Sequence, residues 1–315
     1  MAIIDKDIAK AKALLEKGSL VAIPTETVYG LAGNALDVSA AAKIFTVKDR
    51  PQFDPLIVHV AGIEDAKKYT AEFPEQARLL AENFWPGPLT LLLKKKTIIP
   101  DIVTSGLDTV GIRCPDHPLT LELLRSLKFP LAAPSANPFG YVSPTTPLHV
   151  NDQLGDKIDY ILDGGPCQVG IESTIVGFED HVPVIYRMGG LSLENIQDVI
   201  GNVRLQTHST SNPKAPGQLK SHYAPGKKVM LGTLDELVKH FGKSAGILSF
   251  QKNFGSAYQY ILSPSGDLEE AAKNLFTALR GFDKMPVDVI LTELVPDVGL
   301  GRAINDRLRR AAAVE

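Results

Sequence analysis

The stretch that decides the fold of the first half of this chain is Leu20-Val21-Ala22-Ile23-Pro24-Thr25-Glu26-Thr27-Val28-Tyr29-Gly30-Leu31-Ala32. It contains two apolar runs, 20–23 and 28–32, separated by a proline and three polar residues. Short apolar runs bounded by turn residues are typical of buried strands. We therefore predict two strands joined by a loop that carries two hydroxyls and a carboxylate.

Further apolar runs up to about residue 205 mix with helical patterns. Helices are predicted at 7–17, 39–47, 62–69, 74–84 and 117–127, and further strands at 56–60, 89–93, 110–114, 131–133, 160–162, 173–176 and 182–186. Strands and helices do not alternate strictly. We therefore expect an α/β protein of the α+β kind, whose N-terminal domain is a twisted, mixed open sheet rather than a repeating barrel.

The composition changes between 205 and 226, where the chain is polar, contains proline and glycine and shows no periodicity, as is typical of a linker. Beyond it, strands are predicted at 229–231, 245–250, 259–262 and 287–291, and helices at 234–242, 267–281 and 299–312. This pattern favours a small open α/β sheet. We predict a domain at 1–204, a linker at 205–226 and a second domain at 227–315.

Length and composition agree with two ordinary globular domains. The chain has 315 residues, of which 44% are hydrophobic and 22% are charged. A net charge of −3 argues against a protein built chiefly to coat nucleic acid. Two cysteines without metal-ligand spacing, no secretory signal and no apolar run of about 20 residues predict a cytoplasmic protein with no role at a membrane.

Four cations lie at the ends of predicted elements. Lys48 and Arg50 follow a helix that ends at Pro51, where they would also complement the helix dipole. Arg113 and Arg187 end apolar strands, and a guanidinium in such a place needs a partner such as a carboxylate or a phosphate. A structural ion pair is the alternative for either strand arginine. Because hydroxyl-rich loops accompany both, we infer that at least one of them meets an anionic ligand.

The loop 134–144 follows a predicted buried strand and offers Ser135, Asn137 and Ser143 as hydrogen-bonding groups among three prolines. It is equally consistent with a phosphate cradle and with an ordinary proline-rich turn. The chain has no P-loop, no G-x-G-x-x-G and no G-x-S-x-G. Nucleotidyl transfer needs positioning and charge neutralisation more than a covalent nucleophile, so these absences are compatible with it.

Six motifs together resemble the YrdC-type threonylcarbamoyl-AMP synthases. They are Pro24-Thr25-Glu26-Thr27-Val28-Tyr29-Gly30-Leu31, Lys48-x-Arg50-Pro51, Phe84-Trp85-Pro86-Gly87-Pro88-Leu89-Thr90, Val110-Gly111-Ile112-Arg113, Pro134-Ser135-Ala136-Asn137 and Glu172-Ser173-Thr174-Ile175-Val176. Two later segments, 215–225 and 299–307, resemble the longer, two-domain branch of the family. The resemblance therefore covers nearly the whole chain.

The resemblance implies an enzyme that joins L-threonine, bicarbonate and ATP into L-threonylcarbamoyladenylate and releases pyrophosphate. It implies Mg²⁺ with the ATP and no redox cofactor or resident metal. A separate transferase would carry the product to tRNA, with at most a weak contact between tRNA and this chain. The implied fold is a twisted, mostly parallel sheet around a concave, positively lined cavity, followed by a Rossmann-like domain.

The resemblance also implies roles for individual residues. Lys48, Arg50 and Arg113 would be catalytic. The threonine site would comprise Thr27, His59, Arg113, Ala133 and Ser173. The ATP site would comprise Arg50, Asp54, Thr109, Ser135, Asn137, Ser143, Arg187 and Tyr223, with Tyr223 as part of a lid on the linker. Asp54 departs from the family, which usually has asparagine there, and a carboxylate cannot donate as an amide does.

Two other functions share the same cavity. One is an RNA-binding module without chemistry, which the net charge and the lack of interleaved basic and aromatic residues disfavour. The other is a carbamoyl-adenylate-forming enzyme of the hydrogenase-maturation type. Those chains carry cysteine-rich zinc elements, whereas this one has two cysteines.

Overall fold

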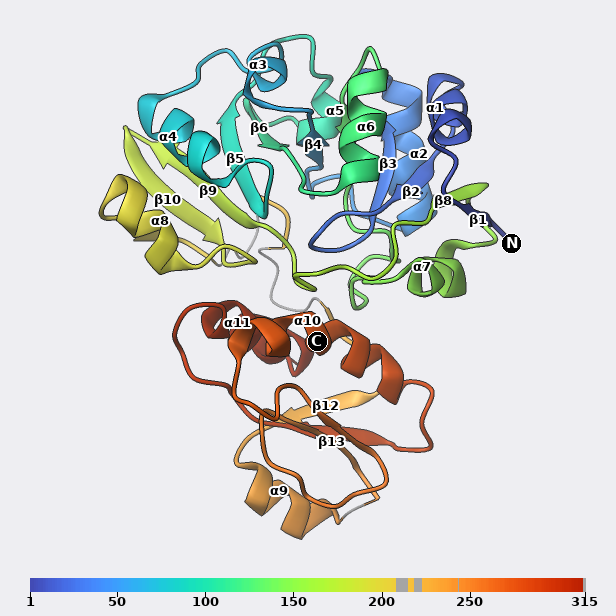
Figure 1. Cartoon of the computed structure of the whole chain (residues 1–315), viewed down its shortest axis with the longest axis vertical. Helices are drawn as coiled ribbons and strands as arrows, with labels where there is room; N and C mark the ends of the chain where they lie inside the picture. Colours follow the sequence, from blue (N-terminus) through green and yellow to red (C-terminus); the bar gives the residue numbers. More distant parts are fainter. Residues whose placement is uncertain (208–214, 218–222, 243, 314–315) are drawn as a thin grey trace.

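The computed structural model describes residues 1–207, 215–217, 223–242 and 244–313. They form two sheets with their own helices, one above the other in Figure 1. The α/β class and the mixed first sheet are confirmed. The predicted linker 205–226 lies largely outside the described residues.

The first sheet runs in the order β1-β8-β2-β3-β7-β4-β6-β5-β9-β10-β11. Its strands are β1 (Ile3–Asp5), β2 (Val21–Ile23), β3 (Gly30–Asn34), β4 (Ile57–His59), β5 (Leu89–Lys94), β6 (Thr109–Arg113), β7 (Leu131–Ala132), β8 (Tyr160–Leu162), β9 (Thr174–Glu179), β10 (Val182–Arg187) and β11 (Arg204–Leu205). The stretch 20–32 forms β2 and β3, which pair antiparallel.

The sheet is mixed, not mostly parallel. Parallel pairs are β1/β8, β2/β8, β4/β6, β5/β9 and β10/β11. Antiparallel pairs are β2/β3, β3/β7, β4/β7, β5/β6 and β9/β10. The expectation of a mostly parallel sheet was therefore wrong. Half of the pairs are antiparallel, and in two of them, β2/β3 and β9/β10, the strands follow each other in the chain without a crossover helix.

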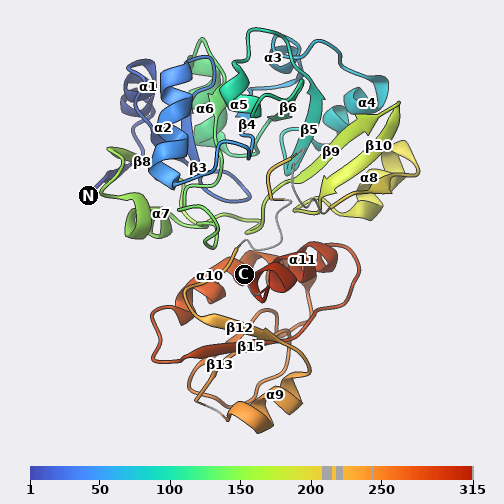
Figure 2. The same cartoon turned by 180° about the vertical axis from the view of Figure 1, so that it is seen from behind.

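Helices cover both faces of the first sheet. They are α1 (Ile8–Glu16), α2 (Val38–Lys48), α3 (Ile63–Ala66), α4 (Glu75–Phe84), α5 (Asp101–Thr104), α6 (Pro118–Ser126), α7 (Pro147–Leu154) and α8 (Leu193–Ile200). Helices α1 and α6 pack together on one face and α2 and α5 on the other (Figures 1 and 2). Asp37 caps α2 by accepting from the backbone of Ser39 and Ala40, which sets where the helix begins.

The second domain is a parallel sheet in the order β12-β15-β13-β14. Its elements are β12 (Lys228–Leu231), α9 (Leu234–Phe241), β13 (Gly246–Ser249), β14 (Gln259–Ile261), α10 (Leu268–Phe282), β15 (Val289–Thr292) and α11 (Gly301–Ala311). Helices α10 and α11 lie between this sheet and the first domain, and α9 lies on the far side (Figures 1 and 2). The predicted open α/β sheet is confirmed.

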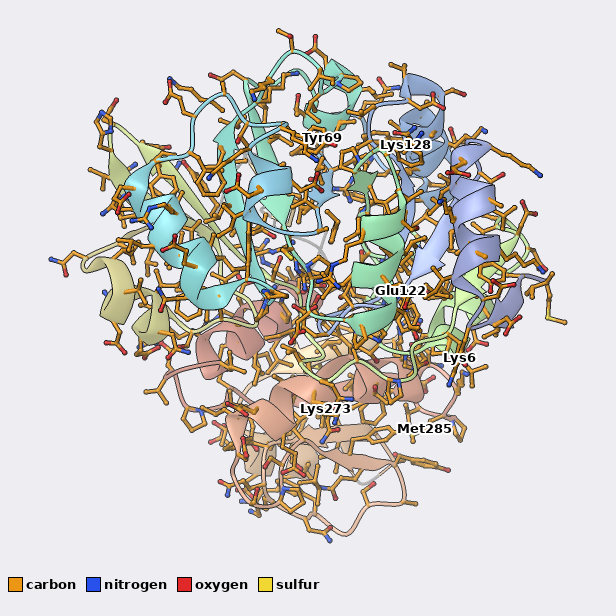
Figure 3. The ribbon with its side chains drawn as sticks, turned by 45° about the horizontal axis from the view of Figure 1, so that its top comes forward. Lys6, Tyr69, Glu122, Lys128, Lys273 and Met285 are labelled. Carbon is orange, nitrogen blue, oxygen red and sulfur yellow. The ribbon has the colours of Figure 1, made fainter. Side chains whose placement is uncertain are left out.

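The two domains share one apolar cluster. Leu91 and Val176 of the first sheet belong to the same cluster as Phe276 of α10 and Leu308 of α11. Gly170 (φ +79°) faces α10 so closely that a Cβ there would lie 2.5 Å from Cα of Lys273. Lys273, labelled in Figure 3, donates to the side chain of Gln168 across this boundary. The second domain is thus packed against the first.

Sequence reasoning missed several short elements, namely β1, α5, α7, α8 and β11. The helix signals were nevertheless present, because Thr146 caps α7 ahead of Pro147, and Ser192 caps α8. Within the described residues, no helix is long and apolar enough to cross a membrane.

Candidate active site

A cavity opens at one end of the central strands. Its walls come from the β2–β3 loop, β4, β6, the segment after β7, the segment before β9, the end of β10 and the interdomain segment. The lining residues are Thr25, Val28, Gly30, Arg50, Ile57, His59, Arg113, Ala133, Pro134, Ser135, Glu172, Ser173, Arg187, Pro216, Gly217 and Tyr223. Eight of the predicted site residues are among them.

Strand register explains why distant residues meet here. His59 is the register partner of Arg113 on the neighbouring strand, and Arg113 is in turn the partner of Thr90. Thr90 pairs in turn with Ile175, two residues after Ser173, and Ile175 pairs with Arg187. Because these positions lie along one line across the sheet, three strand ends deliver their polar side chains to one place.

Arg50 is held by the chain immediately after it. Its Nε donates to the carbonyl of Asp54 at 3.0 Å and a terminal nitrogen donates to the carbonyl of Pro55 at 2.8 Å. The same nitrogen lies 2.9 Å from the Asp54 carboxylate, and both side chains are buried. Burial raises the pKa of Asp54, while Arg50 opposes that rise. Asp54 is therefore a counter-ion behind Arg50 and does not itself line the cavity.

Arg113 meets a second carboxylate. A terminal nitrogen lies 2.7 Å from Oε1 of Glu26, without the alignment of a hydrogen bond, while Nε donates to the carbonyl of Gly87. His59 lines the cavity beside it. Burial, and then the charge of Arg113, lower the pKa of His59 to about 3, so the ring is neutral near pH 7.

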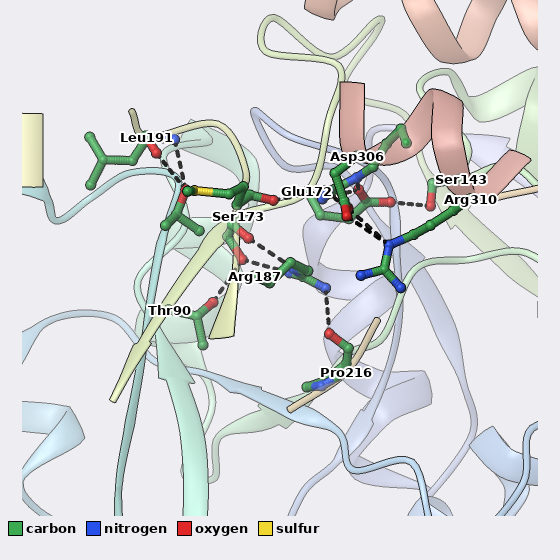
Figure 4. A network of polar contacts seen from close by, with 12 residues as sticks. Thr90, Ser143, Glu172, Ser173, Arg187, Leu191, Pro216, Asp306 and Arg310 are labelled. Atoms are coloured by element: carbon green, nitrogen blue, oxygen red, sulfur yellow. Dashed lines mark hydrogen bonds and ion pairs between the residues drawn. The ribbon is translucent and has the colours of Figure 1, made fainter. Parts of the chain in front are cut away.

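Arg187 differs from the other two arginines. Its Nε donates to the carbonyl of Ser173 and a terminal nitrogen donates to the Ser173 hydroxyl, each at 3.1 Å, while the other terminal nitrogen reaches the carbonyl of Pro216 at 3.4 Å (Figure 4). The Ser173 hydroxyl also bonds Thr90 at 2.8 Å. In the described part of the chain, no carboxylate lies within ion-pairing distance of Arg187. It is a fixed, buried cation without a protein counter-ion there.

Lys48, which the resemblance makes catalytic, is not among the residues that line the cavity. Its ammonium donates to the backbone carbonyls of Ser135 and Asn137 and is almost fully buried. Burial, and then the charge of Arg50, hold its pKa well below the ordinary value. Asn137 likewise turns inward and donates to the carbonyls of Pro138 and Tyr141. Both residues shape the loop that presents Ser135.

Three other predicted residues also lie off the cavity wall. The Thr27 hydroxyl bonds that of Thr25 at 2.9 Å, and Ser143 donates to Glu172. Both therefore support residues that do line it. Thr109 lies at the other end of β6 from Arg113, roughly 13 Å away at the rise of a strand. The structure does not bring Thr109 to this site, and it borders a separate surface depression.

Tyr223 covers the cavity from the interdomain side. Its ring stacks on Phe276 of α10, with centroids 5.7 Å apart, and the Arg307 guanidinium lies over it at 4.9 Å. Gly217 (φ +79°) lies beneath, where a Cβ would come within 2.7 Å of the Tyr223 hydroxyl. Residues 208–214 and 218–222 of the predicted lid lie outside the described residues.

Sequence reasoning left out some contributors. Thr25, Glu172, Pro216 and Gly217 line the cavity, and Glu26 and Arg307 hold residues that do. The sequence pattern could have identified Arg307 as a buried residue. It lies on the same helical face as Ala303, Ile304 and Leu308, so the period of α11 buries a cation.

Comparisons with known proteins agree with this architecture. Residues 13–189 match a family model described as "Telomere recombination", which covers the Sua5, YciO and YrdC proteins. Residues 191–313 match a second model, described as the C-terminal domain of threonylcarbamoyl-AMP synthase. The chain thus carries both parts of a two-domain protein.

Relatives match over nearly their whole length. The chain is 43% identical to the threonylcarbamoyl-AMP synthase of Pyrococcus abyssi, over 96% of this chain and 93% of the relative. It is 41% identical to that of Bacillus subtilis, over 98% and 93%. The crystal structure of P. abyssi Sua5 complexed with L-threonine superposes with a TM-score of 0.91 at 40% identity, covering 99% of this chain and 98% of the other. The chain therefore belongs to the Sua5-type threonylcarbamoyl-AMP synthases, ATP-using enzymes of tRNA modification.

Proposed function

We propose that the cavity joins L-threonine, bicarbonate and ATP into L-threonylcarbamoyladenylate, with release of pyrophosphate and water. The observation that carries the proposal is the pairing of charges around the cavity. Arg50 and Arg113 each face a carboxylate, whereas Arg187 has only neutral partners among the described residues. A buried guanidinium without a counter-ion is a ready site for phosphate oxygens.

Arg113 is the proposed partner of the threonine carboxylate. Its terminal nitrogen makes a close contact with Glu26 that lacks hydrogen-bond alignment, and the two Glu26 oxygens have no other hydrogen-bond partner in the described part of the chain. A bidentate carboxylate would satisfy the donor fork better than this contact does. Neutral His59, Ala133 and Ser173 would complete the threonine pocket.

Arg50 and Arg187 are the proposed partners of the ATP phosphates, together with Ser135, which lines the same cavity on the loop that Lys48 holds. The threonine amine would add to CO₂ released from bicarbonate, giving a carbamate. A carbamate oxygen would then attack the α-phosphorus, and pyrophosphate would leave with the electron pair of the broken P–O bond. The two fixed guanidiniums would stabilise the charge that develops on the phosphate oxygens.

The enclosed position of the cavity matters for such labile groups. Tyr223 and Phe276 shield one side, and excluding water would protect both the carbamate and the adenylate from hydrolysis. The same enclosure disfavours an RNA-binding module, because Arg50, Arg113 and Arg187 are 8%, 4% and 6% exposed, too little for the backbone of a folded RNA to reach them.

Magnesium is proposed as part of the nucleotide substrate. Among the described residues, no group of three histidines, cysteines or acidic side chains is placed to hold a metal ion. Mg²⁺ commonly binds mainly through substrate phosphates. We propose no redox cofactor. The adenylate would pass to a separate tRNA threonylcarbamoyltransferase in the cytoplasm, with only weak contact between tRNA and this chain.

The test is pyrophosphate release with single omissions. Purified protein, ATP and Mg²⁺ should release pyrophosphate only when both L-threonine and bicarbonate are present. Mass spectrometry of the same mixture should detect threonylcarbamoyladenylate. Pyrophosphate release that is unchanged by either omission would contradict the proposal.

A further inference from the structure

Arg307 of α11 reaches from the second domain to the wall of the cavity. Its Nε and one terminal nitrogen donate to the same oxygen of Glu172, at 3.1 and 3.0 Å. The other terminal nitrogen donates to the carbonyl of Met188 at 2.8 Å and to Asp306 at 2.9 Å. The side chain is fully buried.

Two partners of Arg307 adjoin the proposed ATP site. Glu172 lines the cavity and immediately precedes Ser173, while Met188 immediately follows Arg187. The second Glu172 oxygen accepts from Ser143, which completes the carboxylate's contacts (Figure 4). The guanidinium also stacks over Tyr223, the proposed lid residue. One side chain of the second domain therefore contacts two residues of the cavity wall, Glu172 and Tyr223, and the backbone next to a third, Arg187.

Charge gives this contact a consequence beyond packing. Glu172 is a carboxylate on the wall of a cavity that must accept a polyanion. Paired with Arg307 it is neutralised; unpaired, it would repel phosphates and would become a protein counter-ion for Arg187. Asp306 is a second carboxylate beside Arg307, but it lies on α11 itself and also pairs with Arg310 at 3.0 Å. It therefore leaves the charge of Arg307 available to Glu172.

We infer that Arg307 is a positioning residue, through which the second domain neutralises Glu172 and leaves Arg187 free to bind ATP. This assigns the second domain a part in nucleotide binding. The inference rests on the proposed placement of ATP phosphates at Arg187.

The test compares Arg307→Met with the double variant Arg307→Met/Glu172→Gln. Binding of a non-hydrolysable ATP analogue is measured by calorimetry, which does not depend on the reaction. Arg307→Met should weaken binding about tenfold, the effect expected for one uncompensated charge in a partly dry site. Adding Glu172→Gln should restore most of that loss, because it removes the charge that Arg307 neutralised.

A matched control lies on the same helix. Arg302 also pairs across the domain boundary, with Glu194 of α8, but it is partly exposed and does not border the cavity. Arg302→Met should leave analogue binding unchanged. Circular dichroism and thermal unfolding of each variant separate loss of folding from loss of binding.

Two outcomes would overturn the inference: a folded Arg307→Met that binds the analogue as wild type does, or a double variant as weak as the single one. If Arg307→Met does not fold, Glu172→Gln alone is the test. Because this variant removes the negative charge from the cavity wall, it should bind the analogue at least as tightly as wild type, and weaker binding would overturn the inference. Failure of the proposed function would instead appear in wild-type protein, as no binding of the analogue at all.

Discussion

Replacing Arg187 by methionine is the most direct test of the proposed contact between this residue and the ATP phosphates. Methionine keeps much of the volume and removes the charge. A hydrogen bond to a charged group contributes about 1.5–3 kcal/mol. If ATP loses one such contact, its dissociation constant should rise about 10- to 150-fold, at 1.4 kcal/mol per factor of ten.

The unliganded protein should tolerate the change. Ser173 keeps its hydroxyl bond to Thr90, and Arg187 leaves no carboxylate unpaired among the described residues. The carbonyls of Ser173 and Pro216 each lose one donor. We expect a loss of about 1–3 kcal/mol in unfolding free energy from unsatisfied carbonyls, reduced by the more favourable burial of an apolar side chain.

The assay is calorimetric titration with a non-hydrolysable ATP analogue, alongside steady-state pyrophosphate release. Arg187→Lys serves as the comparison, because it keeps the charge but loses the planar fork, and should fall between wild type and methionine. A folded Arg187→Met whose analogue affinity stays within threefold of wild type would refute the assignment of phosphates to this residue.

Three further variants address neighbouring groups. His59→Asn should flatten the pH dependence of stability. The ring has a pKa of about 3 in the folded protein and about 6.5 in the unfolded chain, so as the pH falls the unfolded state takes up a proton first. The unfolding free energy of wild type should therefore fall by about 2 kcal/mol by pH 5, as measured by denaturant unfolding. Asp54→Asn removes the buried counter-ion of Arg50, so it should tighten ATP binding several-fold and lower the melting temperature. Weaker ATP binding would argue against competition between Asp54 and phosphate for Arg50. Tyr223→Ala should lower turnover with the first domain still folded, whereas Tyr223→Phe should keep the stacking of the ring on Phe276. Unchanged kinetics in a folded Tyr223→Ala variant would contradict the lid role.

The sequence predicted the elements whose apolar runs were long enough to be distinctive. The run 110–114 corresponds to β6 at Thr109–Arg113, and the pattern 267–281 to α10 at Leu268–Phe282. It did not predict strand order, because pairing joins residues far apart in the chain. β8, for example, lies between β1 and β2.

The site shows the same limit. Arg113 and Arg187 were singled out because each ends an apolar strand, and both line the cavity. Lys48 shared their charge but not their orientation. It is the last residue of α2, Asp49 after it is left-handed (φ 53°), and the Lys48 side chain turns toward the loop carbonyls. Spacing along the sequence carries no information about that turn.

The second domain shows what longer-range contacts add. The periodicity of α11 could have identified Arg307 as a buried cation, but its partner Glu172 lies more than a hundred residues earlier. Only the packing of the two domains brings them together.

The most direct test of the account is pyrophosphate release by the purified full-length protein with L-threonine and bicarbonate omitted in turn. Pyrophosphate release should require both, and threonylcarbamoyladenylate should be the product. Release that is independent of threonine and bicarbonate, or none from folded protein supplied with all substrates, would contradict it.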